Sequence, residues 1–282
     1  MIAKDINRNI YISTSKVSLI KRLKELLNYR GLLWILAWRD IRVRYKQSVL
    51  GFAWAMFVPL SMMLVFTFIF TLVIRIKTDM PYPIFVFCGL LPWQFFATST
   101  TGAANSLIAN RNLVTKIYFP AEVFPLSCVL ASFIDFLVGC IVLIGMMIFY
   151  SLTSFSIPIG WVSFLVLPVL LVQLIFTSGL SYFLAMGNLF FRDVRYVYNV
   201  IIMLWMFASS VIYPLKTSNL RIQFILNLNP MTPILNSYRD VLLRGKPPDW
   251  GPFLYSAGVG IGILILGWII FFRMQYKFAE KI

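Results

Sequence analysis

The 282-residue sequence is 60% hydrophobic and only 12% charged, which is too apolar for a soluble chain to cover its surface with polar groups. Its formal net charge is +15, and 11 of its 25 lysine and arginine residues lie within the first 46 positions, ahead of the first long apolar stretch. This placement favours anionic lipid headgroups over nucleic acid as partners of the basic residues. The composition therefore predicts an integral membrane protein.

The residue inventory argues against catalysis. The sequence contains no histidine, and Cys88, Cys128 and Cys140 lie in apolar stretches at spacings that match no metal or redox motif. It also lacks a G-x-x-x-x-G-K segment, so ATP binding by a P-loop is not expected. We predict a chain with no catalytic residue, no metal and no cofactor of its own.

The N-terminal region divides into an arm and an amphipathic helix. Residues 1–30 are polar and basic and lack the features of a cleaved signal peptide, so we predict a cytoplasmic arm. Residues 31–50 are predicted to form a helix in the membrane–water interface. At 100° per residue, one face carries Trp34, Trp38, Ile41, Tyr45 and Val49. A basic stripe beside it carries Arg39, Arg42 and Lys46, whereas Arg44 points elsewhere with Asp40. These cations either only orient the next helix or also bind an anionic lipid headgroup.

Six apolar stretches follow a turn at or near Gly51, and each is long enough to cross about 30 Å of hydrocarbon. The predicted spans are 52–74, 84–109, 124–150, 161–190, 196–213 and 253–272. The longest uncharged region is divided at 151–160, where Ser, Thr, Pro and Gly cluster. With the N-terminus in the cytoplasm, 18 of the 25 Lys and Arg residues fall on the cytoplasmic side. We therefore predict that both termini are cytoplasmic.

Two connections between spans carry more than a turn. Residues 110–120 are basic and amphipathic and end at Pro120, which predicts a short cytoplasmic helix or, alternatively, a plain basic loop. Residues 216–251 contain two apolar runs separated by Asn229 and Pro230. An exposed loop has no use for so many leucine and isoleucine residues, so a half-inserted helical hairpin on the external side is expected.

Asp135 is the acidic residue expected deep inside a span, where an ionisable group is expensive and usually faces protein or water. A structural carboxylate paired with an arginine or a hydroxyl is favoured over a proton site, because no histidine or second embedded acid is available to relay a proton. In the last span, Gly258 and Gly262 form a G-x-x-x-G pattern, with Gly260 and Gly267 nearby, that permits close helix packing within or between chains.

Aromatic residues make up 17% of the chain, and many lie near predicted span ends, as in an interfacial belt. Rigid, amphipathic rings within a wet passage can also stack on sugars. The candidates for that role are Trp54, Trp93, Phe95, Phe96 and Tyr213.

Four segments in order resemble one family: W-R-D-I-R-V-R-Y-K-Q-S-V-L-G, G-L-L-P-W-Q-F-F, N-R-N-L-V-T-K-I-Y-F-P and N-P-M-T-P-I-L-N-S-Y-R-D. They are similar to the permeases of type-2 ABC transporters that export lipid-linked polysaccharides such as O-antigen, capsule and wall teichoic acid. The resemblance covers about residues 30–275. It implies an all-α homodimer in the bacterial inner membrane, with two separate ATP-binding-cassette subunits that bind ATP and Mg, and a glycan channel between the halves.

The resemblance also assigns roles along the chain. It makes 51–275 the six-span permease domain, 31–50 a gate helix, 110–120 a coupling segment, 216–251 an external gate hairpin and 276–282 a cytoplasmic tail. It implies contacts with the ATP-binding subunit at Arg111, Asn112, Lys116 and Tyr118. The lipid diphosphate of the cargo would be met by Arg39, Arg42, Arg44 and Lys46, since arginine suits bidentate phosphate contacts.

We therefore expect the non-enzymatic, channel-forming subunit of an ATP-driven exporter of lipid-linked polysaccharide, most simply O-antigen. Capsule, teichoic acid or a small hydrophobic cargo is the alternative. A proton-coupled secondary transporter is disfavoured because one embedded acid and no visible inverted repeat are present. A membrane-bound transferase is disfavoured because the chain lacks histidine and paired carboxylates.

Overall fold

The computed structural model describes residues 26–46, 48, 51–76, 78–116, 120–153, 157–158, 160–214, 226 and 228–278. Every regular element within these residues is helical, and none of them forms a strand. The predicted all-α class is therefore confirmed. The arm at 1–25 and the tail at 279–282 lie outside the described residues.

Five helical segments are long and apolar enough to cross a membrane. They are Gly51–Val73, Tyr82–Ala109 (α4), Val123–Thr153 (α6), Trp161–Phe190 and Trp250–Met274 (α11). The first comprises η1 (Gly51–Ala53), α3 (Trp54–Thr67) and η2 (Phe68–Val73), and the fourth comprises η3 (Trp161–Leu165) and α7 (Val166–Phe190). All five match predicted spans to within three residues at each end, because long uncharged stretches mark them directly in the sequence.

The predicted fifth span is shorter than expected. Helix α8 covers Val194–Ala208, which is about 22 Å at 1.5 Å per residue and less than the hydrocarbon thickness. The helix ends because Ser209 adopts an extended conformation, and Val211 and Ile212 then pack into the core beside the next element. That element is α10 (Met231–Arg239), followed by the π-helical segment η4 (Asp240–Arg244).

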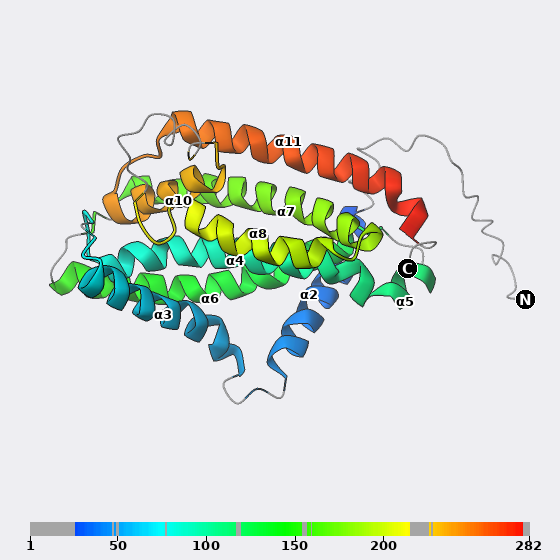
Figure 1. Ribbon diagram of the computed structural model, residues 1–282, viewed down its shortest axis with the longest axis horizontal. Coiled ribbons are helices and arrows are strands. Elements are labelled where there is room, and N and C mark those ends of the chain that lie inside the picture. The colour runs from blue at the N-terminus through cyan, green and yellow to red at the C-terminus, as the bar shows by residue number, and fades with distance from the viewer. Residues whose placement is uncertain are drawn as a thin grey trace, which may run out of the picture.

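The long helices run roughly parallel to the long axis of the molecule (Figure 1). Helix α4 lies at the centre of the bundle, packed against α6 on one side and α7 on another, and α11 lies along α7. Close contact between α7 and α11 requires Gly179, because a Cβ there would lie 2.6 Å from the backbone nitrogen of Leu264. Gly267 packs in the same crossing, whereas Gly258 and Gly262 have open space around them. The G-x-x-x-G pair thus makes no close contact within the chain.

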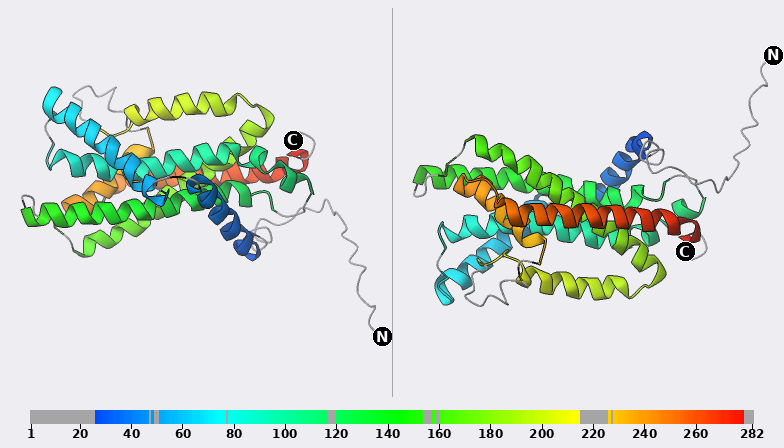
Figure 2. Two further views of the ribbon diagram at one scale, coloured as in Figure 1. Left: turned by 90° about the horizontal axis from the view of Figure 1, so that it is seen from below. Right: turned by 90° about the horizontal axis from the view of Figure 1, so that it is seen from above.

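The two ends of the bundle carry different elements. Helix α10 lies at one end, and α5 (Arg111–Lys116) and η5 (Gln275–Lys277) lie at the other (Figure 1). Helix α2 (Arg30–Tyr45) leaves the α5 end and forms a V with α3, which is seen from two further sides in Figure 2. The chain re-enters helical structure at Gly51, whose φ of +49° is a left-handed conformation that glycine adopts easily, as the predicted turn requires.

Candidate functional site

Helix α2 is held against α6 by a small aliphatic face. Leu36, Ala37 and Ile41 are buried, and Ala37 and Ile41 pack with Ala131 of α6. Trp34 and Trp38 lie on the exposed side, where their rings stack with centroids 6.3 Å apart. The bundle thus contacts small aliphatic side chains of α2 and leaves the two tryptophans on the outer side of the helix, while Ile41 of the predicted aromatic face packs toward α6.

Arg39 connects α2 to the junction between α4 and α5. Its Nε and Nη2 donate to the carboxylate of the neighbouring Asp40, and its Nη1 donates to Asn110 Oδ1 at 2.8 Å. Asn110 follows the last residue of α4, and its backbone carbonyl accepts the N–H groups of Leu113 and Val114 at the start of α5. The predicted gate helix and the predicted coupling segment are therefore joined by a direct hydrogen bond.

Arg44 and Tyr45 both bond to Asp135 of α6. Arg44 Nη1 forms an ion pair with Asp135 Oδ2, and the Tyr45 hydroxyl donates to Asp135 Oδ1 at 3.0 Å. Burial, together with the nearby Asp135 carboxylate, raises the pKa of Tyr45 to about 12, so its hydroxyl stays protonated and can donate at neutral pH. Asp135 is thus paired with an arginine and a hydroxyl, as the structural interpretation predicted.

The remaining two cations of the predicted headgroup site point outward. The Arg42 guanidinium lies 5.7 Å from the centre of the Trp38 ring, and Lys46 is exposed directly after the end of α2. The four predicted residues thus fall into two pairs. Arg39 and Arg44 tie α2 to the bundle, whereas Arg42 and Lys46 face away from it.

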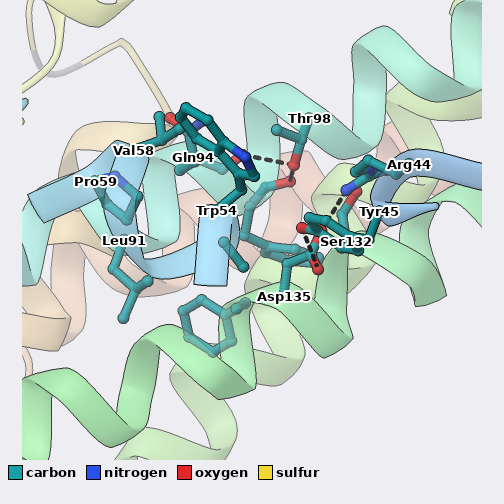
Figure 3. Close-up of a pocket in the computed structure, with 13 residues that line it drawn as sticks. Arg44, Tyr45, Trp54, Val58, Pro59, Leu91, Gln94, Thr98, Ser132 and Asp135 are labelled. Carbon is teal, nitrogen blue, oxygen red and sulfur yellow. Dashed lines mark hydrogen bonds and ion pairs between the residues drawn. The ribbon is translucent and has the colours of Figure 1, made fainter. Parts of the chain in front are cut away.

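A cavity of about 270 Å³ lies between α2, α3, α4 and α6. Figure 3 shows side chains from these helices converging around it, with the Arg44 and Asp135 pair at one side. Its polar lining also includes Gln94, Thr98 and Ser132. Trp54, which is 41% exposed, contributes its ring to the wall.

The predicted channel aromatics do not share one environment. Trp54 and Phe95 line the cavity, and Tyr213 is half-buried with its hydroxyl donating to the Phe207 carbonyl. Trp93 and Phe96 are buried within the chain, where both pack against Trp205. Both rings are enclosed by side chains of the same chain, and their role in lining a channel stays a prediction.

The coupling segment contains the short helix that was predicted. In α5, Arg111 and Asn112 are exposed at the end of the bundle. The side chain of Lys116 and the whole of Tyr118 lie outside what the structure describes. Of the four residues predicted to contact the ATP-binding subunit, the structure therefore describes the side chains of Arg111 and Asn112 only.

The described part of the hairpin region is anchored by polar groups inside the bundle. The Tyr238 hydroxyl donates to Gln173 Oε1 of α7 at 2.7 Å, and Gln173 Nε2 donates to the Pro92 carbonyl of α4. Arg239 is 0% exposed. Its guanidinium donates to the backbone carbonyls of Phe85 and Val211 and lies over the Phe85 ring.

Sequence reasoning missed Arg239 as an anchoring residue, although a single arginine within an apolar run was a usable signal. Gly89 of α4 makes room for it, since a Cβ at position 89 would collide with the guanidinium. The 215–225 part of the predicted hairpin lies outside the described residues. Among the residues that the structure does describe, no three Cys, Asp or Glu side chains are grouped to hold a metal ion.

Comparison with known proteins gives a consistent result. Residues 31–243 match the family model described as ABC-2 type transporter. The O-antigen export system permease protein RfbA of Myxococcus xanthus is 36% identical over 267 residues, which is 94% of this chain and 100% of that protein. The protein of the same name in Klebsiella pneumoniae is 34% identical over 88% of this chain and 94% of its own length. The polysialic acid transport protein KpsM of Escherichia coli is 23% identical over 81% of this chain and 88% of its own length.

Proposed function

The chain belongs to the ABC-2 type transporter family, and from this we propose that it is the membrane-spanning subunit of an ATP-driven exporter of lipid-linked O-antigen. The observation that carries the proposal is the 36% identity to an O-antigen export permease across that protein's whole length. The bundle of long apolar helices supports a multi-pass protein of the bacterial inner membrane. The chain's own role is transport, and ATP with Mg would be bound by separate subunits.

We propose a homodimer with two ATP-binding-cassette subunits, and six membrane crossings per chain. Five crossings are the long helical segments, and the sixth would be α8 continued by Ser209–Tyr213, with the hairpin that contains α10 entering from the external side. The excess of lysine and arginine in the loops on the α5 side supports cytoplasmic termini. The ATP-binding subunits would then dock at that end, where Arg111 and Asn112 are exposed.

The hydrogen bond between Arg39 and Asn110 supports a route from ATP hydrolysis to the cargo. A change in the docking of α5 would move Asn110, which begins α5 and holds Arg39. Arg39 would carry that movement into α2. We propose that α2 thereby opens and closes access for the lipid-linked cargo at the membrane interface.

The outward pair of cations supports a narrower headgroup site than the sequence predicted. Arg39 and Arg44 are committed to side chains of the bundle, so we propose that Arg42 and Lys46 meet the diphosphate of the cargo lipid. Charge-assisted hydrogen bonds of this kind are strong, and an exposed guanidinium can form two at once. Access from the interface requires no rearrangement of the bundle.

Capsular polysaccharide is the second candidate cargo, supported by the similarity to a polysialic acid transport protein at 23% identity. A small hydrophobic cargo is a third. The three cargoes differ in length and chemistry, so they are distinguished by which product remains inside the cell when the gene is removed.

The test is deletion of the gene in its own host. We expect loss of long-chain O-antigen from the cell surface and its accumulation, still attached to its lipid, in the inner membrane. Expression of the chain should restore export only together with an active ATP-binding subunit. Normal surface O-antigen in the deletion strain, with a different envelope polymer retained, would reject the O-antigen proposal.

A further inference from the structure

The seam between α3 and α6 contains two hollows, one that holds a charged pair and one that is lined almost wholly by apolar side chains. The cavity described above lies at its α2 end. A groove of about 560 Å³ continues along the same two helices and is lined mainly by apolar side chains, including Leu60, Met63 and Met146. Both hollows are lined by α3 and α6, the cavity as far as Pro59 and Phe136 and the groove from Leu60 and Val142 onward. A hollow with a charged pair, followed along the same seam by an apolar groove, matches the headgroup and the acyl chain of a lipid molecule.

The charges in the cavity select among lipid headgroups. Arg44 and Asp135 lie side by side, so their charges cancel and the cavity as a whole is neutral. A purely anionic headgroup would be attracted by Arg44 but repelled by Asp135. A headgroup with one phosphate and one ammonium would satisfy both residues at once, because the guanidinium carries N–H groups beyond the one bonded to Asp135.

The hydrogen-bonding groups of the cavity suit a primary ammonium. Ser132 lines the cavity, and its hydroxyl, which is buried in this conformation and bonds to no other described group, would have to turn toward the cavity to accept a hydrogen bond there. Gln94 presents a side-chain amide to the same space. The Trp54 ring at the wall can hold a cation over its face. A primary ammonium has three donors, which matches acceptors on Asp135, Ser132 and Gln94.

The groove accommodates a hydrocarbon chain without rearrangement. Gly145 of α6 lies in its wall, and a Cβ added there would meet no atom within 4 Å. Asp135 and Val142 are separated by about 10 Å along α6, so a headgroup in the cavity would pass its chain directly into the groove. The headgroup would then lie toward the α5 end of the bundle, with its chain running toward the α10 end.

We infer that this seam binds a zwitterionic phospholipid of the phosphatidylethanolamine type, with its headgroup beside Arg44 and Asp135 and one acyl chain in the groove between α3 and α6. The bound lipid fills the wedge behind the α2–α3 V and stabilises α2 against the bundle. This lipid site is separate from the outward cations Arg42 and Lys46, and the proposal does not depend on the identity of the exported cargo.

The test is native mass spectrometry of the full-length protein released from nanodiscs containing equal amounts of phosphatidylethanolamine and phosphatidylglycerol. We expect the parent to retain phosphatidylethanolamine in preference. Asp135→Asn should lower that preference about tenfold or more, because it removes the carboxylate partner of the ammonium while Arg44 remains. Equal retention of the two lipids by the parent, or an unchanged preference in Asp135→Asn, would overturn the proposal.

Two matched pairs of variants locate the lipid. Ser132→Ala should reduce phosphatidylethanolamine retention by about two- to tenfold, the effect of one lost hydrogen bond, without loss of stability. Ser181→Ala removes another buried, unbonded hydroxyl, on α7, and should change nothing. Gly145→Leu should fill the groove and reduce retention of both lipids, whereas Gly258→Leu, also in open space, should not. Equal effects within either pair would reject the site, as would complete displacement of the lipid by octyl glucoside.

Discussion

The two ends of the bundle hold their outermost elements by opposite means. Helix α10 is fixed by Tyr238 and Arg239, whose hydrogen bonds lie wholly inside the protein and reach α4 and α7. Helix α2 is fixed by a small aliphatic face, by the hydrogen bond from Arg39 to Asn110 and by one ion pair to α6, in which the Arg44 side chain is 38% exposed. Buried polar groups are costly to separate, whereas surface ion pairs exchange readily with water. We therefore expect α10 to be held in place more firmly than α2.

The largest loss of stability is expected for Arg239→Met, at the α10 end. The substitution removes the donors for the Phe85 and Val211 carbonyls and for Ser210, so we expect a loss of about 3–5 kcal/mol in the free energy of unfolding. Denaturation followed in detergent micelles measures it. Arg244→Met is the matched control, since Arg244 forms partly exposed ion pairs with Asp79 and Asp240, each worth at most about 1 kcal/mol. Equal losses in the two variants would remove the distinction between the ends.

Gly89→Ala tests the anchoring of Arg239 by filling the space on α4 that its guanidinium occupies. The added methyl group would meet the Arg239 guanidinium and would lie 2.9 Å from the Val211 carbonyl, so we expect a loss of about 1–3 kcal/mol. Gly102→Ala serves as the control, because its Cβ would make an ordinary contact at 3.5 Å with Cys128. The midpoint of thermal unfolding should fall for the first variant and remain near the parent value for the second.

Tyr238→Phe measures how much a single buried hydrogen bond contributes to holding α10. Loss of the hydroxyl leaves Gln173 Oε1 without its donor, which should cost about 1–2 kcal/mol. Because Gln173 also donates to the Pro92 carbonyl, the variant should also loosen the contact between α7 and α4. Hydrogen exchange around Pro92 should increase relative to the parent. Unchanged exchange there would show that Tyr238 does not support the contact.

The smallest effect on stability is expected at the α2 end. Arg39→Ala and Asn110→Ala, combined in a double-mutant cycle, should show a coupling energy of no more than about 1 kcal/mol, because the pair is only partly buried. Their effect on transport should be larger than their effect on stability. We expect both variants to hydrolyse ATP with the partner subunits but to export less cargo per ATP. Export at the parental ratio in both variants would leave α2 uncoupled from α5.

Features set by neighbouring residues could be predicted from the sequence, whereas contacts between residues far apart in the chain could not. Five spans were predicted closely because uncharged stretches are local, and the pairing of Asp135 followed from the cost of placing a carboxylate in a span. The contact between Gly89 and Arg239 was not predictable, since it joins residues 150 positions apart. Trp93 and Phe96 could not be assigned to core or channel because a central membrane helix is apolar on every side. The early end of α8 accompanies hydrogen bonds from Trp205 to Asn229 and from Ser210 to Asn236 of α10, which join residues more than 20 positions apart.

The two arginines that hold α2 have a further consequence. Arg39 bonds to the end of α4 and Arg44 bonds to α6, and the two attachment points are about 7.5 Å apart along α2. Helix α2 therefore acts as a gauge of how α4 and α6 are aligned. Sliding of one helix past the other by about one residue rise would displace the two attachment points by about 1.5 Å, which the two arginine side chains must absorb if both bonds are to persist. Which attachment breaks first decides whether α2 follows α5 or remains with α6.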